Sequence, residues 1–340
     1  MSHHLTITPL LITPGDPAGI GPEIALKALT SDPVLRKSCV LIGDKRHLSQ
    51  LGQTLGLNCE FAKWTPGDPL QDDKINLAEI FWPCEVISGQ PDNRHADLII
   101  ESITTAVQLA RQGDVRGLIT CPIAKSNLYE AGFTYPGHTE YLGALSSTGP
   151  AVMMLANQSL RVVPATIHIP LAKVADTLTQ QDLSDLICHV AGALRSDFNI
   201  TLPHIGLCGL NPHAGENGAM GQEEKEIITP AIAKAKSQLG TQAKISGPYA
   251  ADSLFHHDKR QQFDCIIGMY HDQVLIPVKT IDFHGTVNIT TGLDFIRTSP
   301  DHGTAFDIAG KGLASPDSLI NAIYQAQSMA NNRYGPVNDK

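Results

Sequence analysis

Short apolar runs alternate with helical patterns along most of this chain, and that alternation limits the folds it can adopt. The apolar runs are short enough to be buried strands and lie at residues 9–13, 39–43, 116–120, 151–156, 160–169, 205–210, 264–269 and 285–291. Amphipathic helical spacing lies between them, at residues 45–56, 96–112, 179–194, 223–239 and from 316 on. Strands alternating with helices predict an α/β fold with much parallel pairing.

Composition and charge narrow the class of protein. The 340 residues suffice for two domains, and 42% hydrophobic with 17% charged residues is typical of a soluble globular protein. A net charge of -9 without any run of Lys and Arg argues against nucleic-acid binding. The seven cysteines are scattered without a Cys-x-x-Cys pair, so we expect no disulfide framework. Without a signal-peptide pattern or an apolar run near the roughly 20 residues of a membrane helix, we expect a cytoplasmic protein that does not bind membranes.

Three histidines follow apolar runs in the same way. His168 comes after one expected strand, His213 after the next and His271 after a third. Open α/β sheets place their ligands at the carboxyl ends of strands, and neutral imidazoles that converge there can hold a catalytic divalent metal. The alternative is that each histidine is only a polar group at the rim of a sheet.

A second set of residues could bind an anion. His138 and Thr139 stand in a tight turn into a helix, whose free N–H groups could hold a phosphate or carboxylate. Lys279 follows an apolar run, Asn288 interrupts an expected strand, and Arg297 could pair with a carboxylate or phosphate. The alternatives are a simple helix start, a surface lysine and a structural ion pair. Two glycine-rich loops, at residues 14–23 and 299–312, match neither G-x-G-x-x-G nor the Walker A pattern.

Several long motifs together resemble the 4-hydroxythreonine-4-phosphate dehydrogenase family. They are TPGDPAGIGPEI, YPGHTEYL, GLNPHAGENGAMGQEE, GPYAADSLF, YHDQVLIPVK and VNITTGLDFIRTSPDHGTAFDIAGKG. The resemblance extends from residue 13 to about residue 330 and implies two α/β/α domains with a cleft between them, as in the isocitrate and isopropylmalate dehydrogenases. It implies a cofactor-binding domain at 1–125 plus 285–340, and a metal, substrate and dimerisation domain at 126–284. NAD or NADP would bind without a G-x-G-x-x-G loop.

The resemblance also assigns roles to single residues. It makes His168, His213 and His271 ligands of one divalent metal per subunit, which zinc, cobalt or magnesium could occupy. It gives substrate binding to His138, Thr139, Lys279, Asn288 and Arg297, and proton transfer to Lys279 or Asp252. By looser analogy with related dehydrogenases, the cofactor would lie near His302, Gly303, Thr304 and Asp307. The family is homodimeric, and its active site takes residues from both subunits.

The implied reaction is the oxidation of 4-phosphooxy-L-threonine by NAD(P). Its product, 2-amino-3-oxo-4-phosphooxybutanoate, loses carbon dioxide to give 3-amino-2-oxopropyl phosphate in the biosynthesis of pyridoxal 5'-phosphate. The alternative within the resemblance is a paralogous dehydrogenase of 4-phospho-threonate or 4-phospho-erythronate. Two hypotheses from other classes are an acyltransferase similar to phosphotransacetylase and a metal-binding protein without catalytic activity.

Overall fold

The computed structural model describes residues 8–130, 132–135 and 137–336, which form two compact units. Unit 1 holds the described residues up to Ala151 together with those from Leu293 on, and unit 2 is Val152–Gly292. Both junctions lie later in the chain than the expected domain boundaries after residues 125 and 284. The helix that begins at His138 therefore belongs to unit 1, and the strand that contains Asn288 belongs to unit 2.

Unit 1 contains a parallel sheet. Its strands, in spatial order, are β3 (Phe61–Lys63), β4 (Ile75–Glu79), β2 (Cys39–Gly43), β1 (Leu10–Thr13), β5 (Gly117–Thr120) and β12 (Arg297–Pro300). Each pairs in parallel with its neighbour in this order. The strands β1, β2 and β5 are buried along their whole length, as expected where helices cover both faces of a parallel sheet.

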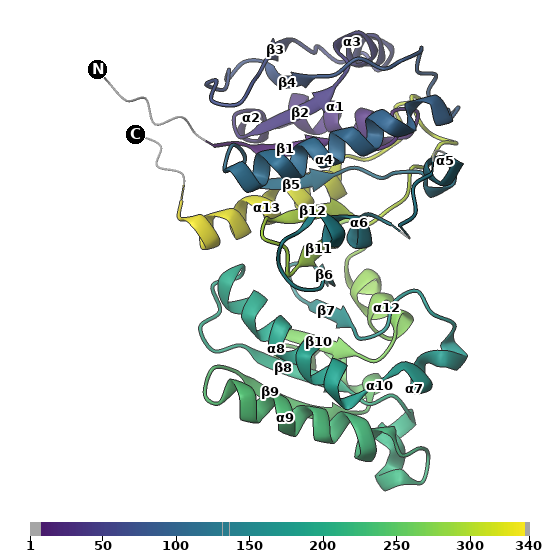
Figure 1. Cartoon of the computed structure of the whole chain (residues 1–340), viewed down its shortest axis with the longest axis vertical. Coiled ribbons are helices and arrows are strands. Elements are labelled where there is room, and N and C mark those ends of the chain that lie inside the picture. The colour runs from purple at the N-terminus through teal and green to yellow at the C-terminus, as the bar shows by residue number, and fades with distance from the viewer. Residues whose placement is uncertain (1–7, 131, 136, 337–340) are drawn as a thin grey trace. The chain divides into compact units, whose positions relative to one another are not determined.

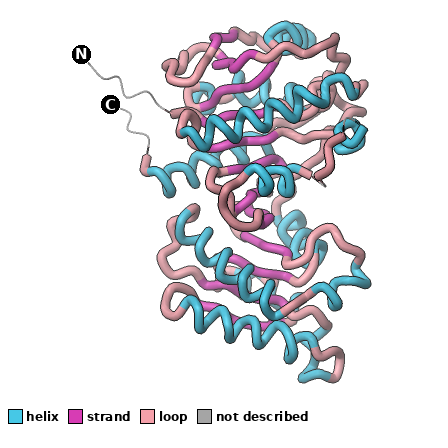
Figure 2. The backbone as a smooth tube through the Cα atoms, in the orientation of Figure 1, coloured by secondary structure: helices cyan, strands magenta, loops and turns pink. Residues whose placement is uncertain are grey.

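Helices connect the strands of unit 1 (Figure 2). They are α1 (Gly21–Ser31), α2 (Pro33–Arg36), α3 (Lys45–Thr54), η1 (Asn93–His95), α4 (Ala96–Gln112), α5 (Lys125–Glu130), α6 (His138–Leu145) and α13 (Asp317–Tyr334). The apolar face of α4 carries Ile99, Ile103 and Val107 into a core shared with Leu11 and Leu118 of the sheet. Burying each such side chain contributes about 1.5–3 kcal/mol to stability. Because these residues recur at helical spacing, they lie on one face of α4, and that face packs against the sheet.

Unit 2 contains a mixed sheet. Its strands, in spatial order, are β11 (Val287–Thr291), β6 (Val152–Ala156), β7 (Arg161–Pro164), β10 (Cys265–Gly268), β8 (His204–Cys208) and β9 (Lys244–Tyr249). The strand β6 pairs antiparallel with both of its neighbours, β7 and β11. From β7 to β9 every pairing is parallel, so these strands end at the same edge of the sheet.

The helices of unit 2 include two long ones that run beside the sheet (Figure 1). The set is η2 (Leu171–Lys173), α7 (Val174–Thr177), α8 (Gln180–Ser196), η3 (Pro212–Gly218), η4 (Glu224–Ile228), α9 (Thr229–Leu239), α10 (Ala251–Leu254), α11 (His257–Arg260) and α12 (His271–Ile281). Thr179 caps α8 by accepting from the Asp182 amide at 3.0 Å, as the sequence predicts. Val274 and Val278 of α12 enter the core with Val162 and Ile266.

The expected α/β class is confirmed, while several elements differ from the sequence-based expectation. The run at 160–169 is a strand only as far as Pro164, so His168 lies in the loop beyond it. The strands β9 and β12 were not expected at all. No helix among the described residues is long and apolar enough to cross a membrane.

The buried imidazole of His47 leads to a prediction about acid stability. Burial lowers its pKa from the ordinary 6.5 to about 4. Between these values the unfolded chain binds more protons than the folded one, so the free energy of unfolding falls as the pH is lowered through this window. Denaturant titrations at about pH 7 and about pH 5 give the free energy of unfolding at each pH. Between these two pH values, it should fall less for His47→Gln than for the wild type. The exposed His257 provides the control, and an equal loss in His47→Gln and wild type would contradict the assignment.

Candidate functional site

The three histidines named from the sequence lie at one edge of the sheet of unit 2. The strands β7, β10 and β8 are neighbours and run in parallel, so their carboxyl ends point the same way. His168 follows β7, His271 follows β10 and His213 follows β8. The pairing of the strands therefore brings together residues that are far apart in the sequence.

The rings of His168 and His271 lie near each other. Their ring centroids lie 5.9 Å apart, with the ring planes tilted by 42°. His271 starts α12, and its Nδ1 lies 2.6 Å from the Oδ1 of Asp272. A carboxylate at this position holds the proton on Nδ1 and leaves the Nε2 lone pair for a ligand, which is the arrangement found beside metal-binding histidines. Asp272 was not picked out from the sequence.

His213 is held in a turn of unusual backbone conformation. His213, Ala214, Glu216 and Asn217 all have φ between 43° and 56°, in the left-handed region that non-glycine residues rarely adopt. Such a conformation costs about 1–3 kcal/mol per residue and persists only where surrounding contacts enforce it. The turn exposes the imidazole of His213.

The buried carboxylate of Glu224 supplies those contacts. Its Oε1 accepts from the backbone amides of Leu210 and Asn211, each at 2.8 Å, and its Oε2 accepts from the Asn211 side chain at 3.1 Å. A Cβ on Gly215 would lie only 2.5 Å from the same carboxylate, so only glycine fits there. Glu224 is one of the acidic residues in the first turn of η4, where the helix dipole favours negative charge. The structure shows that it also anchors the turn that carries His213.

One chain does not bring the three histidines into a closed ligand set. Within the described residues, the ligand atoms of His168, His213 and His271 do not all lie within 4.8 Å of one another. The residue types fit a divalent ion such as zinc, because neutral imidazoles are preferred ligands and Asp272 orients one of them. Their assignment as metal ligands stays a prediction.

Arg297 lies in the interior of unit 1, although it is charged. Only 3% of it is exposed, and its Nε and Nη2 donate to the Thr120 hydroxyl at 3.1 and 2.8 Å. Burial lowers the pKa of the guanidinium to about 10, while the charges of Glu140 and Asp301 oppose that shift. The side chain therefore stays protonated at neutral pH and provides a fixed positive charge at the start of β12.

His138 lies near this charge, in the first turn of α6. Its Nε2 is shielded from solvent and has no hydrogen-bond partner among the described residues. Burial lowers the pKa of His138 well below its ordinary value, with further contributions from the charges of Arg297 and Lys125. A neutral imidazole with an unsatisfied buried nitrogen is costly unless a ligand completes it. Thr139, the next residue, lies partly buried on the same helical turn.

The remaining residues assigned to substrate or proton transfer belong to unit 2. Asn288 stands in the middle of β11, and its buried Oδ1 has no hydrogen-bond partner among the described residues. Lys279 is in the last turn of α12, with its Nζ 5.6 Å from the ring centroid of Phe283. Asp252 is exposed in the first turn of α10. The orphan oxygen of Asn288 agrees with the expectation that this side chain faces a polar group.

The loop expected to bind the cofactor packs against the first glycine-rich loop of unit 1. The Ile20 amide donates to the Thr304 carbonyl at 2.9 Å, and a Cβ on Gly19 would lie 3.0 Å from the same oxygen. The buried Glu23 accepts from the amides of Gly310 and Ala314, at 2.9 and 3.2 Å. The two glycine-rich loops therefore form one surface, on which Gly303 and Asp307 are exposed and His302 is partly exposed.

The fold and the grouped histidines define the class of protein first: an α/β protein of two units that presents imidazoles at the ends of parallel strands. The family described as pyridoxal phosphate biosynthetic protein PdxA matches residues 36–326. The chain therefore belongs to the PdxA family, and the resemblance found in the sequence is confirmed. With it, the prediction of an oxidoreductase in pyridoxal phosphate biosynthesis is confirmed.

Relatives with a common name match nearly the whole chain. The 4-hydroxythreonine-4-phosphate dehydrogenase of Ruegeria sp. (strain TM1040) is 48% identical over 326 residues, covering 94% of this chain and 96% of that protein. The protein of the same name from Caulobacter vibrioides is 47% identical over 338 residues, covering 97% and 99%. The crystal structure of the Klebsiella pneumoniae enzyme of that name has a TM-score of 0.86 at 35% identity, covering 95% of this chain and 99% of the other.

Proposed function

We propose that this chain oxidises 4-phosphooxy-L-threonine with NAD or NADP and a divalent metal. The product, 2-amino-3-oxo-4-phosphooxybutanoate, then decarboxylates to 3-amino-2-oxopropyl phosphate. The observation that carries the proposal is the grouping of His168, His213 and His271 at the ends of adjacent parallel strands, in a chain of the PdxA family. A dehydrogenase of 4-phospho-threonate or 4-phospho-erythronate is the alternative, and the names of the relatives do not favour it.

Each unit contributes its own set of groups to the reaction. In unit 2, His168, His213 and His271 would hold the metal, and Asp272 keeps the proton of His271 on Nδ1. A divalent cation at that position supplies Lewis acidity toward the substrate hydroxyl. Either Lys279 in the last turn of α12 or Asp252 in the first turn of α10 takes the proton of the hydroxyl group.

In unit 1, Arg297 and His138 bind the anionic part of the substrate. Arg297 holds a permanent charge in a site with little water, where it attracts a phosphate or carboxylate more strongly than at the surface. The neutral His138 presents an Nε2 that no described residue satisfies, and Thr139 adds a hydroxyl beside it. The surface formed by the two glycine-rich loops, which includes His302 and Asp307, takes the cofactor.

The active form is a homodimer in which a second chain completes the metal site. In support, the ligand atoms of the three histidines do not converge within the described residues of one chain. Light scattering of the purified protein should give twice the mass of one 36.5 kDa chain. A monomer that is fully active would contradict this part of the proposal.

The deciding experiment is an assay of cofactor reduction. The purified protein is mixed with NAD or NADP and either 4-phosphooxy-L-threonine, 4-phospho-threonate or 4-phospho-erythronate, and NAD(P)H absorbance is followed. We expect 4-phosphooxy-L-threonine to give the highest kcat/KM, and turnover to stop after the metal is removed by a chelator. A higher kcat/KM with either sugar acid would favour the alternative, and no reduction with any of the three would overturn the proposal.

Arg297→Lys tests the anion site without removing its charge. Lysine cannot reproduce the two contacts of the guanidinium with Thr120, so the charge loses its fixed position. We expect KM for the phosphorylated substrate to rise about 10-fold or more, the effect of losing one charged hydrogen bond, with a smaller change in kcat. Arg111→Lys, at a 46% exposed ion pair in the same unit, is the control. An unchanged KM would remove Arg297 from the substrate site.

A further inference from the structure

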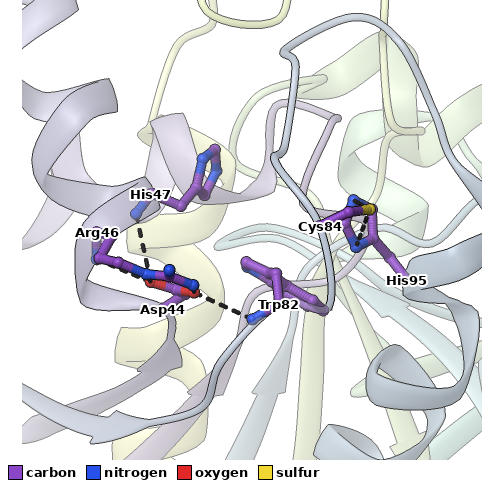
Figure 3. Close-up of polar contacts among 6 residues, drawn as sticks. All are labelled: Asp44, Arg46, His47, Trp82, Cys84 and His95. Carbon is purple, nitrogen blue, oxygen red and sulfur yellow. Dashed lines mark hydrogen bonds and ion pairs between the residues drawn. The ribbon is translucent and has the colours of Figure 1, made fainter.

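A second group of metal-ligand residues lies in unit 1, far in the sequence from the three histidines. Cys84, Asp92 and His95 each offer one ligand atom, and these atoms all lie within 4.8 Å of one another. Figure 3 shows Cys84 and His95 facing each other from the loop after Trp82 and from the turn that starts α4. Neither the sequence motifs nor the proposed reaction uses this group.

The distances from the Cys84 sulfur to the other two ligand atoms are close to those of a tetrahedral zinc site. Zinc lies about 2.3 Å from sulfur and about 2.0–2.2 Å from nitrogen or oxygen, so a tetrahedral centre separates its sulfur and nitrogen ligands by roughly 3.6 Å. The Sγ of Cys84 lies 3.7 Å from the Nε2 of His95 and 3.9 Å from the Oδ2 of Asp92. The same sulfur lies 4.0 Å from the Nδ1 of His95, so the partly exposed Cys84 side chain has to move to place its sulfur beside the lone pair of a single ring nitrogen.

The imidazole of His95 is held in a fixed orientation. The residue is 1% exposed, and its ring meets that of Trp82 edge-on, with 5.4 Å between the centroids. One ring nitrogen is hydrogen-bonded to the backbone of Glu85. A ring N–H given to a backbone carbonyl fixes the tautomer and leaves the other nitrogen as a lone-pair donor, as in most metal-binding histidines.

Asp92 supplies the carboxylate of the group. Its Oδ1 and Oδ2 accept from the Nε of Arg94 at 3.0 and 2.9 Å. Arg94 competes with a cation for this carboxylate, but its side chain is 67% exposed and can turn into solvent at little cost. The Oδ1 of Asp92 also caps η1 by accepting from the Arg94 amide at 2.9 Å, so the carboxylate keeps its place when the ion pair opens.

An ion can reach this group from solvent. Cys84 is partly exposed and lines a cavity of about 350 Å³ together with Asp44, His47 and Glu85. Arg46 lines the same cavity and pairs with Asp44, so the access that the cavity provides is to the thiol of Cys84. A thiolate with an imidazole and a carboxylate selects zinc over the hard cations magnesium and calcium, which prefer oxygen ligands.

We propose that Cys84, Asp92 and His95 form a second divalent-metal site, which binds zinc and is separate from the site of the three histidines. Binding converts the Cys84 thiol to a thiolate, so one proton is released for each ion bound. The fourth position stays open to water or to a small ligand.

Cobalt(II) provides a probe that distinguishes the two sites. A thiolate bound to cobalt gives a charge-transfer absorption in the near ultraviolet, whereas a site made of three imidazoles contains no sulfur and does not. When metal-free protein is titrated with cobalt(II), we expect this absorption to saturate at one thiolate-bound ion per chain. It should disappear in Cys84→Ser and persist in His213→Ala, so the result does not depend on the proposed function.

Three further variants sharpen the test. Cys59→Ser replaces another partly exposed thiol and should leave the absorption unchanged. Asp92→Asn keeps an N-cap but loses the charge, and should weaken cobalt binding about 10-fold or more. Arg94→Gln removes the competitor and should tighten binding, which an ion pair of purely structural role would not do. Absence of the absorption in the wild type, or its persistence in Cys84→Ser, would overturn the proposal.

Discussion

His271→Ala should strip the catalytic metal from the protein and reduce turnover by more than about 100-fold. Loss of a residue that merely orients a metal ligand costs about 10–100-fold in metal affinity or activity, and loss of the ligand itself should exceed that range. The side chain of His271 is 35% exposed at the start of α12, so alanine leaves no buried cavity and the fold should persist. The effect should therefore appear in metal content and kcat rather than in stability.

Metal content by mass spectrometry and cofactor reduction are measured on the same preparations. Asp272→Asn tests the geometry more finely, because it keeps the imidazole and weakens only the contact that holds its proton on Nδ1. The metal content and turnover of Asp272→Asn should lie between those of the wild type and those of His271→Ala. His257→Ala, which changes an exposed histidine of the same unit, should resemble wild type. Full metal content and turnover in His271→Ala would exclude His271 as a ligand.

The residues that we propose as metal and substrate ligands could be named from the sequence, because their surroundings leave a local pattern. His213 follows a buried apolar run and an Asn-Pro turn, and Asn288 is a polar residue within a strand pattern. What the pattern does not contain is the order of the strands. That β10 lies between β7 and β8 depends on pairings between residues about 60 to 100 positions apart, such as Ile266 with Val162 and with Gly206.

Buried polar strands were the other obstacle to prediction. The strand β12 has the sequence RTSP, without one residue of the apolar pattern, yet all four positions are buried. Its stability comes from partners distant in the sequence, since Arg297 bonds to Thr120 and the Thr298 hydroxyl donates to the Ala322 carbonyl at 2.7 Å. Some residues hold other residues in position, such as Thr120, Asp272 and Glu224. No sequence pattern identifies them, because their role depends on contacts that exist only in the folded chain.

Glu224→Ala should destabilise unit 2 more than any other single change at this site. The substitution leaves the partly buried amides of Leu210 and Asn211 without their acceptor, and an unsatisfied buried donor costs about 1–3 kcal/mol. We therefore expect the free energy of unfolding to fall by about 2–6 kcal/mol. The left-handed conformation of His213 and its neighbours would then lack the contacts that enforce it, so metal affinity should fall as well.

Denaturant unfolding gives the global effect, and amide hydrogen exchange of the peptide that covers residues 209–221 gives the local one. Glu226→Ala, at an exposed position of the same acidic cluster, separates the carboxylate contact from the general charge at a helix start. If the acidic residues acted only through the helix dipole, both substitutions would cost a similar 0.3–1 kcal/mol or so. A large loss confined to Glu224→Ala, with faster exchange in the turn, would instead show that His213 owes its position to one buried carboxylate.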